Sequence, residues 1–513
     1  MRVLIVRPIA PNERFGLGPF FRIEPLGSEY VAAGLQAAGH EADVYDLRFS
    51  PRLERLLERH RPHVVGIAGA HTLDTGEVLA VARRVKAFDP AIVTLAGGHA
   101  VAVYPEPFED PAVDAVCLED GERAAPALVA ALQTGEPLQG VPGILARADR
   151  RDPSCRSFLA GPSSAERVGL DEVPLPARSR LRSSHRHYLC VQRKPVYLVE
   201  TARGCPYRCR FCTVWQHVAR SYRCRSIDWV CRDLQSVGGN VFVADDLFWY
   251  PPERSLELAV ELRRRGIRKD WLLVQTRTDL VARHPDLLEA WRPAARHFDI
   301  FFGFEAPTDR GLQGLSKDSG TDDTRRAVDL CRRLGYGITG NFIVDPDWGV
   351  EDFENLWDFT DSMQLNHVGF TILTPLPGTA FFEEMKARIL EPDWSCYDMH
   401  HILWEPRLGR ERFFALFAET WRRTALHVRD RRGIWSYLRQ VRPAQIPFML
   451  SVLRRSRRLF DPAADLTETF PPGAGAVFPP AGTADAAPAG RIDRGDVSSS
   501  GENPIRATAA RVQ

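Results

Sequence analysis

Short apolar runs alternate with amphipathic segments along the first 145 residues of the chain. Runs of strand length are expected at residues 2–6, 42–47, 64–68, 92–96 and 115–118. Between them, apolar residues recur at helical spacing, and helices are expected at residues 25–38, 51–60, 77–88 and 121–133. This alternation predicts a parallel sheet with helices on both faces. Such a sheet binds ligands at the carboxyl ends of its strands.

The same alternation resumes after residue 194. The expected strands are 196–200, 241–244, 271–276, 299–304, 337–344 and 367–373, and the expected helices are 228–237, 253–265, 285–291, 322–334 and 350–363. Six such units predict a partial (β/α)6 barrel, with catalytic groups at the carboxyl ends of its strands.

The chain is therefore predicted to be an α/β protein of several parts. These are a Rossmann-like domain, a linker, the partial barrel, a helical region and a tail, at residues 1–145, 146–193, 194–400, 401–460 and 461–513. The tail is rich in Pro, Ala, Gly and Ser, a composition typical of disorder.

Composition excludes several classes of protein. A length of 513 residues exceeds one ordinary core, and a net charge of +1 gives no reason to expect a nucleic-acid partner. We find no signal peptide and no apolar run of transmembrane length. The ten cysteines are scattered rather than paired, which favours a reducing, cytoplasmic location.

Three of these cysteines stand close together, in the stretch Thr201-Ala-Arg-Gly-Cys205-Pro-Tyr-Arg-Cys209-Arg-Phe-Cys212. Thiolates at such short spacing are typical ligands of iron–sulfur clusters. Three ligands on a 4Fe–4S cluster leave one iron open for substrate. A structural zinc site is the first alternative, but it usually needs a second ligand pair, which we do not find. Three unrelated buried thiols are the second alternative.

This cysteine motif after a strand resembles the signature of the radical S-adenosylmethionine (radical SAM) superfamily. The resemblance implies that Cys205, Cys209 and Cys212 hold a 4Fe–4S cluster and that S-adenosylmethionine binds its open iron. It also implies five contacts to S-adenosylmethionine, from Phe211, Asp245, Asp246, Glu305 and Gly378. Core packing for the phenylalanine and a helix cap for the aspartates are the alternatives. The weaker candidates are Gln275, Arg277 and Asn341.

The first domain resembles the cobalamin-binding domain that precedes many radical SAM domains. The matching stretches are Glu24-Pro25-Leu26-Gly27, Gly97-Gly98-His99 and Asp120-Gly121-Glu122. Dinucleotide binding is not expected, because no G-x-G-x-x-G follows the first strand. The alternatives are a regulatory or interaction module and histidines without a ligand role. The residues that the resemblance implies for cobalamin are His71, Thr72, Gly97, Gly98, His99, Gly121 and Glu122.

One motif of other cobalamin domains is missing. The loop that contains His71 lacks the pattern Asp-x-His-x-x-Gly. The resemblance therefore implies that cobalt has no histidine ligand in this protein.

Four further stretches, at residues 21–27, 275–280, 345–348 and 374–379, resemble the hopanoid C-3 methylases. This implies methylation of an unactivated sp3 carbon of a hopanoid lipid, with cobalamin carrying the methyl group and flavodoxin or ferredoxin supplying electrons. The alternatives are a ring cyclase, a methylase of a natural product or pigment, and a sensor without catalysis. A methylthiotransferase is not expected, because Cys117 is the only cysteine before residue 150.

Aromatic and basic residues recur at helical spacing in residues 407–429 and 433–459. A basic amphipathic stretch is typical of peripheral contact with a membrane surface, which would suit a lipid substrate. A helical cap over the barrel is the alternative.

Overall fold

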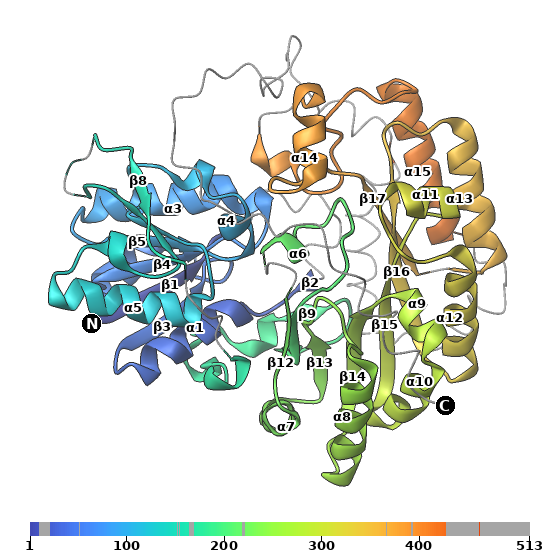
Figure 1. The fold of residues 1–513 in the computed structure, drawn as a ribbon, viewed down its shortest axis with the longest axis horizontal. Coiled ribbons are helices and arrows are strands. Elements are labelled where there is room, and N and C mark those ends of the chain that lie inside the picture. The colour runs from blue at the N-terminus through green and yellow to red at the C-terminus, as the bar shows by residue number, and fades with distance from the viewer. Residues whose placement is uncertain are drawn as a thin grey trace.

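The computed structural model describes residues 1–9, 21–50, 52–150, 152, 154–163, 169–217, 221–365, 367–390, 393–426 and 461. Two sheets with their helices lie side by side, the first in blue and cyan and the second in green and yellow (Figure 1). The α/β class is confirmed, with the Rossmann-like unit before the partial barrel.

The first sheet has the strand order β3-β1-β4-β5-β6-β7-β8. Its first five members in that order run parallel and include every strand predicted before residue 145. They are β1 (Arg2–Arg7), β3 (Glu41–Asp46), β4 (Val64–Ala68), β5 (Val93–Gly97) and β6 (Ala115–Cys117). The sheet continues beyond residue 145 through two antiparallel strands, β7 (Ile144–Arg147) and β8 (Phe158–Ala160).

Helices cover both faces of this sheet, as the continuous apolar strands require. They are α1 (Leu26–Ala37), α2 (Leu53–His60), α3 (Thr75–Phe88), α4 (His99–Val103) and α5 (Gly121–Thr134). Helices α1 and α5 approach closely at Gly34, where any side chain would collide with the carbonyl oxygen of Glu122. This contact brings the start of α5 beside α1, next to the carboxyl end of β6.

The second sheet has six parallel strands in the order β10-β13-β14-β15-β16-β17. They are β10 (Tyr197–Val199), β13 (Asn240–Val243), β14 (Lys269–Thr276), β15 (Ala295–Glu305), β16 (Gly337–Val344) and β17 (Val368–Ile372). The main helices between them are α7 (Ile227–Ser236), α8 (Pro252–Arg264), α10 (Pro285–Trp291), α12 (Thr321–Arg333) and α13 (Val350–Ser362). The predicted partial (β/α)6 barrel is confirmed.

Several short elements are absent from the prediction. Two of them pair into a hairpin at the cysteine motif, β11 (Ala202–Gly204) with β12 (Tyr222–Cys224). The strands β2 (Phe21–Arg22) and β9 (Leu189–Cys190) form a second small pair. The short helices are α6 (Val214–His217), α9 (Thr278–Arg283), α11 (Asp309–Gly314) and α14 (Ala380–Met385).

The last described helix, α15 (Arg410–Leu426), packs against the barrel. Its Phe413 ring lies 5.9 Å from the ring of Phe353 on α13, and its Trp421 ring lies 5.3 Å from that of Phe370 on β17. This part of the aromatic stretch is therefore a cap on the barrel. The basic stretch at 433–459 and the tail after residue 461 lie outside the described residues. None of the described helices is both long and apolar enough to cross a membrane.

Candidate active site

The three cysteines of the motif follow the β11 strand, at the carboxyl end of the first barrel strand. Gly204 has φ of 102°, a left-handed conformation that glycine adopts without strain, and it turns the chain into Cys205. The backbone then folds back, because Cys212 N donates to Cys209 O at 3.1 Å and Trp215 Nε1 donates to the same oxygen at 3.0 Å. The loop is therefore held by one hydrogen bond within its backbone and by one from the Trp215 side chain.

The spacing of the three thiols distinguishes between the kinds of metal site. Within the described residues, one set of three His, Cys, Asp or Glu donors has its ligand atoms all within 4.8 Å of one another, and the cysteines do not belong to it. A single zinc ion would need sulfur atoms about 3.8 Å apart. Burial raises the pKa of Cys205 to about 11 and of Cys212 to about 12, and the neighbouring thiols add to both shifts. The donor set thus fits a multi-iron cluster better than one ion.

Two cations lie near Cys209. Arg277 Nη1 is 3.8 Å from its sulfur, and the guanidinium lies over the Tyr207 ring at 3.7 Å. Asp279 anchors Arg277 through a 2.8 Å hydrogen bond, while Arg277 Nη2 is buried without a hydrogen-bond partner in the described part of the chain. Lys317 acts on the same thiol by its charge. Sequence reasoning ranked Arg277 as weak and missed Lys317, which no motif marks.

The two aspartates after β13 have different surroundings. Asp245 is buried, and its oxygens accept hydrogen bonds from Thr201 N at 2.6 Å, Thr201 Oγ1 at 2.5 Å and Ala202 N at 3.1 Å. Burial raises its pKa to about 7. Asp246 accepts from Gly204 N at 2.9 Å and borders a cavity. The Asp245 carboxylate thus holds the strand before the cysteines, and Asp246 is the aspartate that faces open space.

Glu305 adopts a strained backbone at the end of β15. Its φ is 63°, and the sheet register shifts between Gly303 and this residue. Left-handed backbone in a residue other than glycine is uncommon and clusters at functional sites. Lys317 Nζ pairs with the Glu305 carboxylate at 3.0 Å and also donates to the Gly303 carbonyl. Glu305 therefore lies in the same group of charges as Cys209.

The remaining two candidates for S-adenosylmethionine pack against other parts of the chain. Phe211 contacts an apolar cluster that includes Phe381 and Trp404. Gly378 has φ of 84°, and a side chain there would collide with Val103 on α4. The loop after the last barrel strand thus rests on the first domain. The roles of these residues toward a cofactor remain predictions.

A cavity of about 440 Å³ opens between the two sheets at the carboxyl ends of their strands. Six of the seven cobalamin candidates line it: His71, Gly97, Gly98, His99, Gly121 and Glu122. Thr72 is not among its lining residues. The barrel contributes Leu198, Glu200, Arg203, Val214, Ala244 and Asp246.

The walls of this cavity suit a large, flat, mostly apolar ligand. Apolar side chains from β1, α1, β4 and α5 line it together with glycines. At Gly98 a side chain would lie 2.5 Å from the carbonyl oxygen of Gly69. His99 Nε2 is 2.7 Å from Thr213 Oγ1, so this histidine joins the first domain to the cysteine loop. Burial lowers the His99 pKa to about 4, with His71 adding to the shift.

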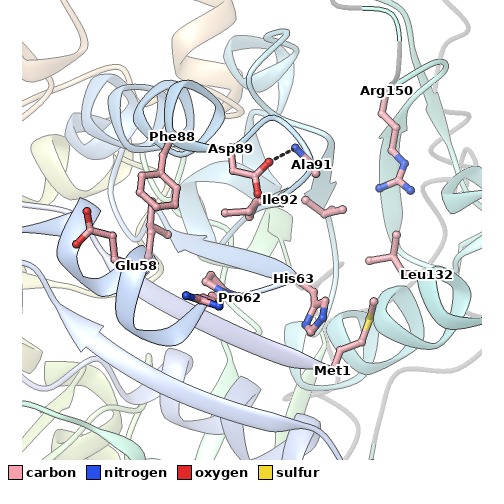
Figure 2. Close-up of a pocket in the computed structure, with 13 residues that line it drawn as sticks. Met1, Glu58, Pro62, His63, Phe88, Asp89, Ala91, Ile92, Leu132 and Arg150 are labelled. Carbon is pink, nitrogen blue, oxygen red and sulfur yellow. Dashed lines mark hydrogen bonds between the residues drawn. The ribbon is translucent and has the colours of Figure 1, made fainter.

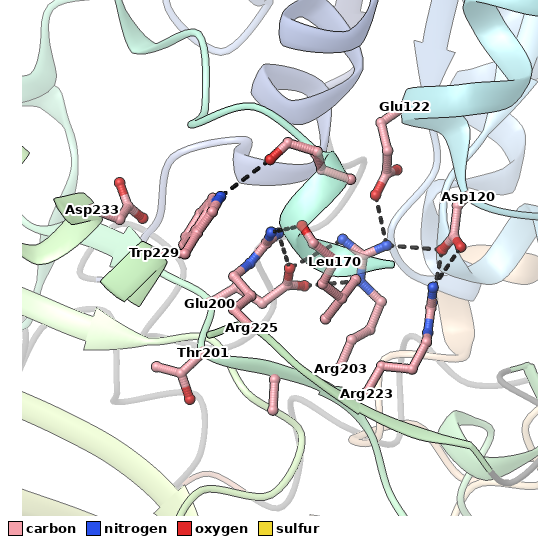
Figure 3. Close-up of polar contacts among 12 residues, drawn as sticks. Asp120, Glu122, Leu170, Glu200, Thr201, Arg203, Arg223, Arg225, Trp229 and Asp233 are labelled. Atoms are coloured by element: carbon pink, nitrogen blue, oxygen red, sulfur yellow. Dashed lines mark hydrogen bonds and ion pairs between the residues drawn. The ribbon is translucent and has the colours of Figure 1, made fainter. Parts of the chain in front are cut away.

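Ion pairs also connect the two domains beside the cavity (Figure 3). Arg203 donates to Asp120 Oδ1 and to Glu122 Oε1, each at 2.8 Å, and its Nε donates to Glu200 at 3.0 Å. Arg223 adds two hydrogen bonds to Asp120. Sequence reasoning missed the arginines, because their partners in the first domain are about 80 residues or more away in the chain.

A second cavity, of about 640 Å³, lies at the opposite edge of the first sheet (Figure 2). Its wall includes Met1, His63 and Ile92, which stand just before three of the parallel strands. None of the candidate site residues lines it. This cavity lies at the amino-terminal ends of the strands, whereas parallel sheets bind ligands at the carboxyl ends. We therefore place the functional site in the cavity between the domains.

Comparison with known proteins supports this assignment. Residues 20–129 match the B12 binding domain, and residues 199–360 match the radical SAM superfamily. The chain is 29% identical over 408 residues to the hopanoid C-3 methylase of Methylococcus capsulatus, covering 78% of this chain and 76% of that protein. It is 24% identical over 431 residues to the anaerobic magnesium-protoporphyrin IX monomethyl ester cyclase of Rubrivivax gelatinosus, covering 79% and 74%.

A solved structure has the same fold. It is the radical S-adenosylmethionine methyltransferase TsrM from Kitasatospora setae, with cobalamin and a 4Fe–4S cluster bound. The TM-score is 0.60 at 19% sequence identity, covering 75% of each chain. The B12 binding match contains β3 to β6 of the first sheet, and the radical SAM match contains the cysteine loop and β13 to β16 of the second. The chain therefore combines a B12 binding domain with a radical SAM domain.

Proposed function

We propose that this protein is a methyltransferase that acts on an unactivated sp3 carbon of a lipid-like molecule, with C-3 of a hopanoid as the favoured position. The observation that carries the proposal is the cavity between the domains. Its cobalamin candidates lie on one side, and the strand that leads into the cysteine loop lies on the other. Sites at domain interfaces are common for ligands that must meet there.

The residues have distinct roles in this proposal. Cys205, Cys209 and Cys212 would hold the cluster, and the glycine-rich edges after β5 and β6 would hold cobalamin. When bound, these groups and S-adenosylmethionine supply the radical chemistry and the methyl group. The protein binds and orients these groups and the substrate, and it excludes water from the site.

Asp246, Arg277 and Glu305 would orient S-adenosylmethionine. The carboxylate of Asp246 would accept hydrogen bonds from its ammonium group, as charge-assisted pairs favour. The Nη2 group of Arg277 has no hydrogen-bond partner in the described residues. It would donate either to the carboxylate of S-adenosylmethionine or to a sulfide of the cluster. Lys317 would hold Glu305 in place beside them.

The choice of substrate rests on similarity. The hopanoid C-3 methylase aligns over 408 residues, from both domains of this chain. A ring cyclase is the second candidate, since the magnesium-protoporphyrin cyclase covers a similar share of the chain at lower identity. In either case a small electron-transfer protein, such as flavodoxin or ferredoxin, would reduce the cluster. Peripheral contact of the 433–459 stretch with a membrane would give access to a lipid substrate.

Expression in a host that makes hopanoids without a methyl group at C-3 tests the proposal. Lipid mass spectrometry should detect a hopanoid heavier by one methyl group, and feeding with deuterated methionine should label that group. The matched control is the Cys209→Ser variant, which should give none. If the purified, anoxic protein forms 5′-deoxyadenosine but the host makes no methylated hopanoid, the substrate assignment is wrong. If it forms no 5′-deoxyadenosine, the enzyme assignment is wrong as well.

A further inference from the structure

Three buried carboxylates lie beside the cofactor cavity, away from the cysteine loop. Glu24 and Glu29 flank the start of α1, and Asp233 lies on α7; their exposed fractions are 1%, 0% and 0%. One guanidinium, that of Arg178, faces all three. Its Nη1 lies 2.5 Å from Asp233, and its Nε lies 3.6 Å from Glu24 and 4.0 Å from Glu29. Three carboxyl groups thus share one close guanidinium.

Most of the hydrogen-bonding capacity of Arg178 is used elsewhere. Besides Asp233, it donates to the Leu198 carbonyl at 2.6 Å. Glu24 Oε1 accepts from Leu198 N at 2.6 Å. Both carboxylate oxygens of Glu29 are buried without a hydrogen-bond partner among the described residues. Burial, with Glu24 adding to the effect, raises the pKa of Glu29 well above its usual value. Since a buried charge without a partner is costly, Glu29 ionises only beside a further cation, which the described residues do not supply.

A histidine completes the group. His185 Nε2 lies 2.9 Å from Glu24 Oε2, and one ligand atom each from Glu24, Glu29 and His185 lie within 4.8 Å of one another. In the described part of the chain this is the one such set of three donors. A tetrahedral ion with nitrogen and oxygen ligands needs them about 3.4 Å apart, so small side-chain movements would close the site.

The charges favour an ion with two positive charges. Metal ligands bind in their deprotonated form. Once ionised, the three carboxylates together with Arg178 carry an excess of two negative charges, which one divalent cation cancels. Lys269 donates to the carbonyls of Leu234, Val237 and Gly238, and it is not among the charges that shift the pKa of Glu29. Two carboxylates with one imidazole are a donor set that borderline first-row ions accept.

We propose that Glu24, Glu29 and His185 bind a divalent transition-metal ion, such as Mn²⁺ or Zn²⁺. The His185 side chain is 23% exposed, which gives the ion a path from solvent and water for its open positions. The site joins α1 of the first domain to the segment before β10. Because Glu24 also lines the cavity, the ion fixes one wall of the cofactor site.

Mn²⁺ binding to the full-length protein, loaded with cluster and hydroxocobalamin, tests this proposal. Free Mn²⁺ gives a solution EPR signal that is lost on binding, and the oxidised 4Fe–4S cluster and Co(III) are both diamagnetic. We expect one Mn²⁺ per chain, displaced by Zn²⁺, and a higher melting temperature when the ion is present. Mn²⁺ also avoids the thiols, which prefer softer ions.

The variants Glu29→Gln and His185→Gln should each weaken Mn²⁺ binding by about tenfold or more and abolish the gain in melting temperature. Glutamine is neutral and similar in size to glutamate, so Glu29→Gln should fold without the ion. The exposed Glu172, in the same connecting segment, gives the control variant Glu172→Gln, which should bind as the parent does. The proposal would be overturned if the parent bound neither Mn²⁺ nor Zn²⁺, or if both site variants bound Mn²⁺ as tightly as the parent does.

Discussion

Arg203 Nη1 donates a 2.8 Å hydrogen bond to Asp120 Oδ1, and the two residues belong to different domains (Figure 3). Arg203 lies on β11, two residues before the first cysteine of the motif, and Asp120 precedes α5 at the edge of the cavity. The same guanidinium also binds Glu200 and Glu122. The position of the cysteine loop is thus tied directly to the wall of the cavity between the domains.

Replacing Arg203 with glutamine should therefore separate the two halves of the site. Glu122 would lose its ion pair in a place where its side chain is only 7% exposed. We expect a loss of about 3 kcal/mol in the free energy of unfolding, measured by urea denaturation, and more 5′-deoxyadenosine formed per methylated product. The control is Arg84→Gln, which breaks an exposed pair with Glu54 and should cost less than about 1 kcal/mol. Equal losses in the two variants would contradict this role.

Each cysteine of the motif should be needed for the cluster. Cys205→Ser, Cys209→Ser and Cys212→Ser should each lower the iron and sulfide content of the anoxically reconstituted protein to near background, because thiolates are the preferred ligands. Cobalamin should still bind, since its cavity is lined mainly by the first domain. The control is Cys155→Ser, at a partly exposed cysteine outside the motif. A full cluster in any of the three motif variants would show that this cysteine is not a ligand.

Much of the fold could be predicted because alternating elements leave a local pattern in the sequence. The expected strand at residues 337–344 has the same bounds as β16, and the expected helix at 285–291 has the same bounds as α10. Pro285 marks the first position of α10, and β16 ends in the short apolar run Phe342-Ile-Val344. The strands β11 and β12, with three residues each, are too short for any such pattern.

The cysteine loop could also be predicted, because its ligands are close in sequence. The pairing of Arg203 with Asp120 could not, since it depends on how two domains meet. The two aspartates after β13 looked equivalent in sequence, yet Asp245 is consumed by hydrogen bonds to Thr201 and Ala202. Which of two neighbouring carboxylates faces a cavity depends on the orientation of the strand in the folded sheet. The spacing of residues in the sequence does not determine that orientation.

The stability of the cobalamin-free protein should fall in mild acid because of His99. Burial lowers its pKa from 6.5 to about 4, so the folded state keeps this imidazole neutral where the unfolded state binds a proton. The contribution of His99 to the free energy of unfolding is therefore fully present above pH 6.5. It is lost as the pH falls toward 4, by about 3 kcal/mol at most. In the His99→Gln variant, the urea concentration at the midpoint of unfolding should change less with pH over this range. The exposed His297 provides the control variant, His297→Gln, whose profile should match the parent's.

Replacing Asp245 and Asp246 with asparagine should have different effects, one on stability and the other on cofactor binding. Asp246→Asn should weaken binding of S-adenosylmethionine to the cluster-loaded protein by about tenfold or more, because a charge-assisted hydrogen bond becomes a neutral one. Asp245→Asn should instead lower stability. An amide oxygen can still accept from Thr201 N and Ala202 N, but the NH2 group can no longer accept from Thr201 Oγ1, and the remaining bonds lose the charge that strengthens them. Isothermal titration calorimetry and urea denaturation separate the two effects. Tight binding by Asp246→Asn together with weak binding by Asp245→Asn would reverse the assignment.

Gly378 should be required by the packing of the two domains as well as by its backbone conformation. Gly378 and Gly409 both have left-handed backbones, with φ of 84° and 74°. A side chain at Gly409 would meet nothing within 4 Å, whereas one at Gly378 would collide with Val103 Cγ1 and lie 2.9 Å from the Val103 carbonyl oxygen. Alanine at either position costs about 1–2 kcal/mol for the backbone, and the collision adds about 1–3 kcal/mol at Gly378 alone.

Urea denaturation of Gly378→Ala and Gly409→Ala should therefore show the larger loss in Gly378→Ala. Adding Val103→Ala to that variant should recover part of the difference, because it removes Cγ1 but leaves the carbonyl oxygen in place. Val103 ends the helix that begins at His99, so Gly378→Ala should also weaken cobalamin binding, which Gly409→Ala should not. Equal losses from the two alanines would mean that the barrel loop does not rest on α4 in solution.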